Sequence, residues 1–265
     1  MSGARGRVPV PLVRPSAGDG QELLLAAGAA LRAARAWRAT APVRRGRALL
    51  AVAAALEQRR AELVDEVRRQ QGARVSEALG AVDAALDELV RWAGWADKLH
   101  LLGVGRPGPA AVVGVVVPRS DVLLAPVRAV APVLAAGAGA VLVRPAGTGT
   151  AADALVRAVA EEVSPGLLGA VDTARAAPRE LAAAVELVDV RWADPGDAAA
   201  YRTAAAAAGC PVVALHDEVP AEERLPEETG DAAAEDATDR RRPEDLPDAE
   251  RVRPFRTGPD LPDTA

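Results

Sequence analysis

The sequence predicts an α/β fold in which N-terminal helices are followed by a parallel sheet with helices on both of its faces. Over about the first hundred residues, apolar side chains recur at helical spacings of three and four. From residue 111 onward, short apolar runs such as "AVVGVVV" lack alternation, as expected of strands covered on both faces. Helical stretches separate these runs, and such βαβ units place their strands in parallel. The predicted strands are 111–117, 140–143, 167–171, 185–192 and 211–215.

Cap and stop signals divide the N-terminal region into three helices. The first begins near Asp19, which Glu22 follows three residues later as in a capping pair. Thr40 and Pro42 suit the cap and first turn of the second helix. This helix is predicted to run without a break to Gly72.

The third predicted helix has Ser76 as its candidate cap. Its apolar side chains recur at spacings of three and four, which predicts one stripe that faces the core. The stripe consists of Leu79, Val82, Leu86, Val90 and Ala93.

Aliphatic side chains must fill the core of this protein. Half of the 265 residues are hydrophobic, but they include one Phe, one Tyr and four Trp. Only Lys98 among the 32 basic residues is a lysine, a bias typical of genomic base composition, so single arginines carry little functional weight. Cys210 is the only cysteine, and His100 and His216 are the only histidines, which predicts no disulfide, no metal site and no redox chemistry.

Acidic residues are concentrated toward the C-terminus. From Asp217 onward lie 16 of the 37 acidic residues but only 7 of the 32 basic ones, with seven of the 21 prolines. A segment with this composition has too few apolar side chains to offset the conformational entropy that it would lose on folding. Residues 219–265 are therefore predicted to form a disordered acidic tail. The alternative is an acidic arm that docks on a basic partner or folds back on the chain's own arginines. The remainder is predicted to be an N-terminal arm, 1–18, and one domain, 19–218.

The sequence predicts neither a secretory leader nor a membrane helix. The N-terminal "MSGARGRVPVPLVRP" has no apolar segment. The longest charge-free apolar run, "AVAPVLAAGAGAVLV", is 15 residues long and broken by Pro132, whereas a membrane helix needs about 20. We therefore expect a cytoplasmic protein with no membrane partner, and we expect no nucleic-acid partner.

Four stretches resemble the aldehyde dehydrogenase superfamily, in family order and at roughly family spacing. They are "ARAWRATAPVRRGRALLAVAAALEQRRAELVDEV", "AGWADK", "VVGVVVP" and "VAPVLAAGAGAVLVRP". The resemblance covers about residues 20–216 and corresponds to the N-terminal, cofactor-binding portion of such an enzyme. It implies an incomplete Rossmann-type sheet, similar to the inactive second module of some two-module members.

The first departure from the family lies at the end of the strand 111–117. The family places there a Trp and then an Asn whose side-chain amide stabilises the oxyanion of the thiohemiacetal, whereas this chain has Arg119 and Ser120. An oxyanion hole needs a donor held about 3 Å from the developing charge, and a serine hydroxyl is a single short donor. Ser120 is therefore predicted to be a helix N-cap, and this strand end a former active-site position.

The second departure concerns the cofactor. The family's Lys before the Pro of "VLKP" binds the adenosine ribose of the nicotinamide cofactor. This chain reads "VLVRP" with one extra residue, so Arg144 or Val143 takes that place. Because arginine can hydrogen-bond a ribose hydroxyl or a phosphate, Arg144 is the candidate for a vestigial cofactor-binding residue. The alternative is a surface arginine at a strand end.

The third departure follows the fourth strand, where the family has a Gly-Ser pair and a later Gly that let a helix terminus approach the pyrophosphate. In "RWADPGDAAAYR", Asp194 and Pro195 take the place of the pair and Ala199 that of the later Gly. A carboxylate repels a pyrophosphate and proline removes an amide donor, which Gly196 alone does not restore. We expect no bound cofactor, or NAD(P) held weakly at most.

The catalytic positions of the family are also unmatched. His216, Asp217 and Glu218 lie near the place of the family's general-base Glu. The sequence offers no nucleophile that any of them could activate. The family's cysteine lies some tens of residues beyond that Glu, whereas Cys210 precedes the strand and is predicted to be a small buried residue. No catalytic residue is assigned.

The sequence therefore leads us to expect a catalytically inactive aldehyde dehydrogenase-like protein, a structural or regulatory subunit of a full-length aldehyde dehydrogenase. Only "LHLLGVGRPGPAAV" fills the place of the family's oligomer-building hairpin, so the usual tetramer is not expected. A sheet without its usual partner domain exposes apolar surface to a protein partner. The alternatives are an NAD(P)-dependent aldehyde oxidoreductase and a remnant without function.

Overall fold

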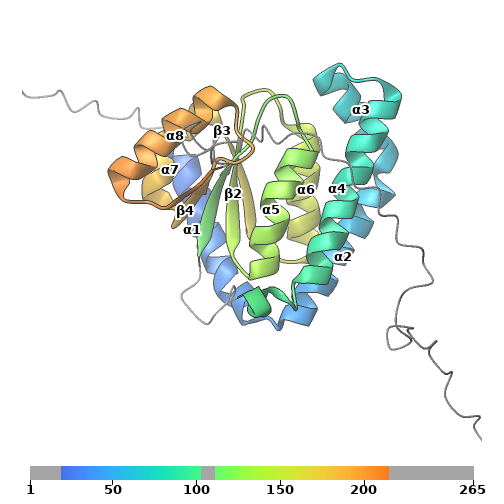
Figure 1. The fold of residues 1–265 in the computed structure, drawn as a ribbon, viewed down its shortest axis with the longest axis horizontal. Helices are drawn as coiled ribbons and strands as arrows, with labels where there is room; N and C mark the ends of the chain where they lie inside the picture. Colours follow the sequence, from blue (N-terminus) through green and yellow to red (C-terminus); the bar gives the residue numbers. More distant parts are fainter. Residues whose placement is uncertain (1–18, 103–110, 215–265) are drawn as a thin grey trace, which may run out of the picture. The chain divides into compact units, whose positions relative to one another are not determined.

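Five parallel strands form the sheet at the centre of the structure (Figure 1). The computed structural model describes residues 19–102 and 111–214. The strands lie in the order β3-β2-β1-β4-β5, and each adjacent pair is parallel. They are β1 (Val112–Val116), β2 (Gly139–Arg144), β3 (Leu168–Asp172), β4 (Leu187–Asp189) and β5 (Val212–Val213). The predicted parallel sheet is confirmed, although β4 is shorter than the run 185–192 because the chain turns away from the sheet after Val190.

Helices cover both faces of the sheet, as predicted. One face carries α1 (Asp19–Ala39), α7 (Pro178–Ala184) and α8 (Pro195–Ala208). On the other face, α5 (Leu124–Ala136) and α6 (Thr150–Glu162) contact the strands directly. An outer layer of α2 (Pro42–Gln58), α3 (Arg60–Gln71) and α4 (Val75–Trp95) packs over them, followed by a short 3₁₀ helix, Leu99–Leu102. None of the helices in the described parts of the chain is long and apolar enough to span a membrane.

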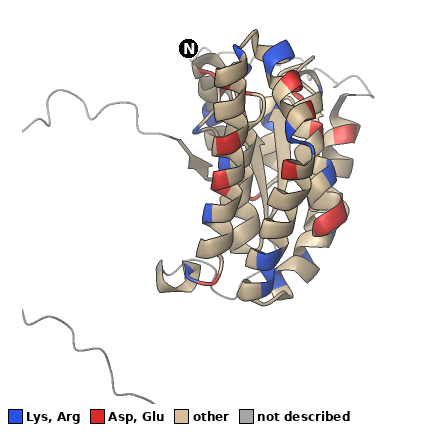
Figure 2. Ribbon diagram, turned by 90° about the vertical axis from the view of Figure 1, so that its right-hand side faces the viewer, with Lys and Arg blue, Asp and Glu red and all other residues tan. Residues whose placement is uncertain are grey.

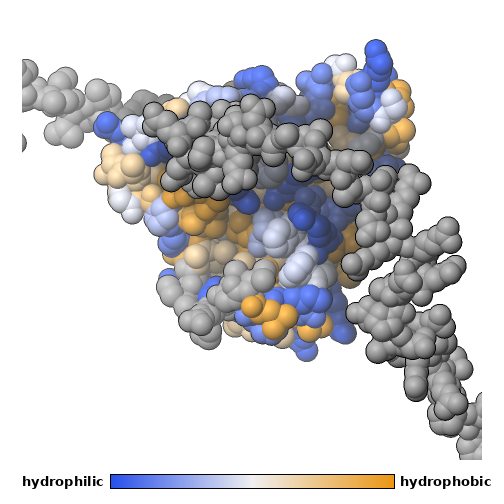
Figure 3. All heavy atoms as spheres, in the orientation of Figure 1, coloured by the Kyte–Doolittle hydropathy of each residue, from blue (hydrophilic) through white to orange (hydrophobic). Residues whose placement is uncertain are grey.

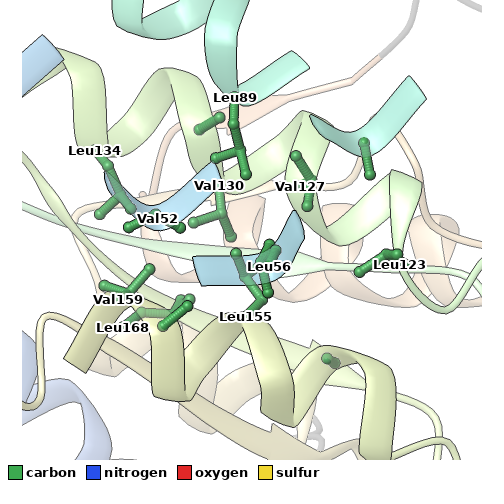
Figure 4. Close-up of a cluster of buried hydrophobic side chains, with 14 of the residues drawn as sticks. Val52, Leu56, Leu89, Leu123, Val127, Val130, Leu134, Leu155, Val159 and Leu168 are labelled. Atoms are coloured by element: carbon green, nitrogen blue, oxygen red, sulfur yellow. The ribbon is translucent and has the colours of Figure 1, made fainter. Parts of the chain in front are cut away.

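The larger core lies between the sheet and these two helical layers. Figure 4 shows side chains from α2, α4, α5 and α6 converging on one another, with Leu89 and Leu155 on opposite sides of the cluster. A second cluster on the opposite face joins α1 to α7 and α8 through Leu23, Leu181 and Tyr201. Nearly all of the buried apolar side chains are Leu, Val or Ala, so the predicted aliphatic core is confirmed.

The predicted second helix is in fact two helices, which is a correction to the sequence analysis. The backbone breaks at Arg59, where φ is −105° and ψ is 17°. This break redirects α3 so that Leu63 and Val67 enter the core, where α3 contacts α4 and α6. Figure 2 shows acidic and basic residues interspersed along the outer helices, and some of them form ion pairs, such as Arg59 with Glu62. The predicted stop at Gly72 is confirmed by its left-handed φ of 65°.

The cap predicted for α4 is wrong, and its predicted core stripe is right only in part, since Val82 and Ala93 are buried and Leu86 is half-buried. The helix begins at Val75, and the backbone N–H of Arg74 donates to Glu77 Oε2 at 2.8 Å, so Ser76 is not the cap. Of the predicted stripe, Leu79 and Val90 are exposed. The buried stripe is Ala78, Val82, Ala85, Leu89 and Ala93. Its alanines let α4 lie close to α2 and α5.

Two buried polar side chains tie the N-terminal helices to the end of α5. The indole Nε1 of Trp37 donates to the carbonyl of Leu134 at 2.8 Å. The guanidinium of Arg45 donates from Nε to the carbonyl of Ala135 at 3.0 Å, and from Nη1 to that of Thr40 at 2.8 Å. The bond to Ala135 satisfies a carbonyl in the last turn of α5, and the carbonyl of Leu134 also accepts from the backbone N–H of Gly137 at 3.0 Å.

We expect Gly46→Ala to destabilise the protein, because a Cβ on Gly46 would lie 2.6 Å from the carbonyl oxygen of Ala93 in α4. Overpacking of this kind costs about 1–3 kcal/mol, less about 1 kcal/mol from the better helix propensity of alanine. Urea unfolding measures the difference in free energy.

Gly80→Ala is the matched control, since a Cβ there meets nothing within 4 Å. It should stabilise α4 by about 0.4–1 kcal/mol. Equal changes in the free energy of unfolding for the two variants would show that the contact between α2 and α4 is loose enough to accommodate a Cβ.

Candidate functional site

The candidate site is the carboxyl edge of the sheet between β1 and β4. From β1 the chain continues to β2 on one side, whereas β4 pairs with β1 on the other side. Ligands of open α/β sheets bind outside the carboxyl ends of the strands at such a switch point. The segments that leave β1 and β4 meet here, and the backbone N–H of Arg119 donates to Asp194 Oδ2 at 3.1 Å. The structure therefore brings two predicted site positions into direct contact.

Ser120 is exposed at this edge and is not a helix N-cap, which corrects the prediction. Helix α5 begins only at Leu124, and Leu123 is its N-cap residue. The carboxylate of Asp121 accepts a bond from the backbone N–H of Leu123 at 3.3 Å, so this aspartate, and not the serine, organises the turn. An exposed hydroxyl that water solvates is not a preorganised donor for an oxyanion.

Arg144 lies at the end of β2 in a network of ion pairs. Its guanidinium is 3.3 Å from a carboxylate oxygen of Asp153 and 3.5 Å from one of Asp172. Its Nη1 also donates to the carbonyl of Thr148 at 3.1 Å, and the side chain is 16% exposed. Arg144 therefore holds the ends of β2, β3 and α6 together. Val143, the other residue considered for this position, is fully buried in the core.

A cavity of about 360 Å³ lies beside Arg144. It is lined by Glu66, Gln70, Arg144, Gly147, Gly149, Thr150 and Asp172. Two carboxylates, Glu66 and Asp172, face this space together with the single cation. Because Asp172 already pairs with Arg144, the cavity offers an anionic ligand no uncompensated positive charge among the described residues.

At the turn after β4, a proline and a carboxylate stand where the resemblance implies a pyrophosphate site. Pro195 is the first residue of α8 and has no amide N–H to donate. Asp194 stands before it, and its carboxylate bonds to Arg119 instead of capping α8. Ala199 is exposed and lines a groove with Ala177 and with Pro178, the first residue of α7. These residues do not fit the nicotinamide cofactor that the resemblance implies.

Two features of this edge were not predicted. Asp189, the last residue of β4, is 3% exposed, and the guanidinium of Arg191 binds it with contacts of 2.7–3.2 Å. Their hydrogen bonds raise the pKa of Arg191. In addition, the guanidinium carbon of Arg128 lies 5.5 Å from the centre of the Trp192 ring. The spacing in "VDVR" places Asp189 and Arg191 on one side of an extended chain and was the available signal for the first pair.

Cys210 lies just before β5 and is half-buried, where the sequence predicted a buried residue. Its Sγ is 3.7 Å from the carbonyl of Val185. Burial raises the pKa of the thiol, and the Glu186 carboxylate adds to this shift. The thiol is therefore protonated near neutral pH and is a poor nucleophile.

Several predicted positions lie outside the described residues. His216, Asp217, Glu218, the arm 1–18, the tail 219–265 and residues 103–110 of the connection before β1 belong to this set. Within the residues that the structure does describe, His, Cys, Asp and Glu form no group of three or more that could hold a metal ion.

Comparison with solved structures supports the same fold. The structure of HpcC from Thermus thermophilus has a TM-score of 0.66 at 22% identity and covers 74% of this chain and 41% of its own. A putative aldehyde dehydrogenase from Burkholderia cenocepacia has a TM-score of 0.66 at 26% identity and covers 74% and 44%. A NAD-dependent benzaldehyde dehydrogenase from Corynebacterium glutamicum has a TM-score of 0.62 at 23% identity and covers 71% and 44%. The chain thus spans about two fifths of the length of these structures.

No match to a curated protein was found. A family model described as "Aldehyde dehydrogenase family" matches residues 10–190. This match covers more than half of the chain and includes β1 to β4, α1 to α7 and both sides of the switch point. The chain therefore belongs to the aldehyde dehydrogenase family.

Proposed function

We propose that this chain is a catalytically inactive member of the aldehyde dehydrogenase family that serves as a structural or regulatory subunit of a full-length aldehyde dehydrogenase. The observation that carries the proposal is the contact between Arg119 and Asp194 at 3.1 Å. The Asp194 carboxylate lies at the turn that the resemblance matches to the family's pyrophosphate site, beside a proline that donates no N–H. A negative charge and a missing donor both oppose cofactor binding.

The acyl-transfer chemistry of the family is also unsupported by the residues at the site. Ser120 is exposed where the family has an oxyanion donor, and Cys210 is the single cysteine of the 265 residues. A neutral, half-buried thiol that precedes β5 does not supply the thiolate that attacks an aldehyde. A role in assembly therefore accounts better for this fold than turnover does.

Exposed apolar side chains support a protein partner. Leu24 and Leu25 on α1 are 62% and 64% exposed, and Leu101 is 72% exposed. A groove of about 580 Å³ between α7 and α8 is lined largely by alanines, and Figure 3 shows apolar surface over α8. Burial of such surface contributes about 25 cal/mol per Å², before association costs. A full-length enzyme of the same family is the partner whose own domains already pack against this fold.

We expect no aldehyde-dependent reduction of NAD⁺ or NADP⁺ by the purified chain, because no thiolate and no oxyanion donor lie at the candidate site among the residues described. Absorbance of the reduced cofactor measures the rate over a panel of aliphatic and aromatic aldehydes. Cys210→Ser should leave the result unchanged. Turnover that this substitution abolishes would show that Cys210 is the nucleophile.

Dinucleotide binding should be weak and should improve when Asp194 loses its charge. A like charge at about 4 Å costs on the order of 1 kcal/mol in water, so Asp194→Asn should raise the affinity for NAD⁺ about fivefold in calorimetric titration. Asp197→Asn, one turn into α8, is the matched control and should have a smaller effect. Micromolar binding by the unaltered chain that Arg144→Ala removes would instead establish a working cofactor site.

Co-expression with a complete aldehyde dehydrogenase from the same genome should yield a complex whose scattering mass exceeds that of either protein. The partner should also raise the melting temperature of this chain, since it binds only the folded state. Ala200→Arg in the groove between α7 and α8 should weaken the complex, whereas Ala54→Arg on the exposed side of α2 should not. If this chain stays monomeric and does not bind the enzyme, the proposed role is contradicted.

A further inference from the structure

Helices α2 and α4 share an outward face on which apolar side chains are open to solvent. Leu50 on α2 is 46% exposed, and Val90 on α4 is 50% exposed. The two helices pack against each other in the outer layer, on the side of the molecule that Figure 2 turns toward the viewer. Exposed apolar side chains on two packed helices form a surface that a protein partner can cover.

Two contacts show that α2 and α4 run antiparallel. Near the start of α2, a Cβ on Gly46 would lie 2.6 Å from the carbonyl oxygen of Ala93, which is near the end of α4. Just after the end of α2, Arg60 forms an ion pair with Asp83, in the first half of α4. The direction of the two helices fixes which of their side chains lie at the same height along the pair.

Leu50 and Val90 lie at about the same height. Leu50 follows Gly46 by one helical turn, and Val90 precedes Ala93 by about one turn. Since the helices are antiparallel, both steps lead in the same direction from the contact between Gly46 and Ala93. The two exposed apolar side chains therefore lie at the centre of the face.

Arg47 and Asp87 lie about one turn to either side of this centre. Arg47 precedes Leu50 by three residues, toward the start of α2. Asp87 precedes Val90 by three residues on the antiparallel helix, and so lies toward the end of α2. Both are exposed, and neither forms an ion pair with the residues that the structure describes. The face carries an unpaired cation at one end and an unpaired carboxylate at the other.

We propose that two copies of this chain associate through the α2–α4 face, which consists of Arg47, Leu50, Asp87 and Val90. A two-fold axis that crosses the helices at the height of Leu50 places Leu50 of one copy against Leu50 of the other. The same axis exchanges the two ends of the face, so Arg47 of each copy meets Asp87 of the other. Charge complementarity of the face with itself is what selects a second copy as the partner.

The size of the face is sufficient for a specific but weak dimer. Helix α2 has 17 residues and is therefore about 26 Å long. Two such helices, each about 10 Å wide, present about 500 Å² per copy, or about 1,000 Å² in total, which is the lower limit for a specific interface. The dimer should therefore exchange with the monomer at accessible protein concentrations. It uses a different face from the groove between α7 and α8 and does not depend on the function proposed above.

Sedimentation equilibrium of the full-length chain tests the proposal. The average mass should rise from that of the 27.2 kDa monomer toward twice this value between about 1 and 500 µM protein. Leu50→Arg places two like charges at the axis and should keep the chain monomeric over this range. Leu24→Arg makes the same change at an exposed leucine of α1 and should leave the dimer intact.

Charge exchange tests the pairing of Arg47 with Asp87. Arg47→Asp and Asp87→Arg should each weaken dimerisation about tenfold, because each replaces two symmetry-related ion pairs by like-charge contacts. The double variant Arg47→Asp/Asp87→Arg restores opposite charges across the axis and should recover most of the lost affinity. A change that acts only on the folding of the monomer would not be reversed in this way.

Three results would overturn the proposal. They are a monomer mass at every concentration, a dimer that Leu50→Arg leaves intact, and a double charge variant no tighter than the two single variants. Ala200→Arg, in the groove between α7 and α8, should have no effect on the dimer. If Ala200→Arg abolished the dimer and Leu50→Arg did not, the second copy would bind in the groove instead.

Discussion

Close contact between backbones is the constraint on which the rest of this structure depends. An interior built from Ala, Val and Leu reaches normal packing density only where helices lie near one another and near the sheet. Glycines permit this close approach of backbones at two contacts. A Cβ on Gly46 would meet the carbonyl of Ala93 at 2.6 Å, and one on Gly139 would meet that of Ala30 at 2.8 Å. The first contact joins α2 to α4, and the second seats α1 on β2.

The same constraint explains which parts of the fold were predicted from the sequence and which were not. Strands β1 and β2 are covered on both faces, so their continuous apolar runs identified them. On α4, the predicted core stripe wrongly included Leu79 and Val90, whose larger side chains are exposed. Ala78 and Ala85 are buried instead, because only small residues allow α4 to approach α2 and α5 so closely. Hydrophobicity alone does not distinguish a tight contact from a loose one.

The candidate site was predicted as a set of positions but not as a set of contacts. Strand ends and helix starts placed Arg119, Arg144 and Asp194 at one edge of the sheet, and the structure agrees. The bond from Arg119 to Asp194 depends on the pairing of β1 with β4, two strands far apart in the sequence. The partners of Arg144 depend likewise on how β3 and α6 lie beside β2. Such long-range geometry has no local signature.

The unequal connection of β4 to the rest of the sheet has a consequence for folding order. Strands β1, β2 and β3 follow one another along the chain and pair through registers of five residues, so this half can form from successive contacts. Strand β4 pairs with β1 over three residues, and β5 pairs with β4 over two. Pairing β4 with β1 closes a long loop, which contains β2 and β3, and this closure is slow. The pairing also adds few interactions. The segment from β4 to β5 is therefore expected to join last and to open first, so the carboxyl edge of the sheet is lost in partial unfolding while the larger core persists.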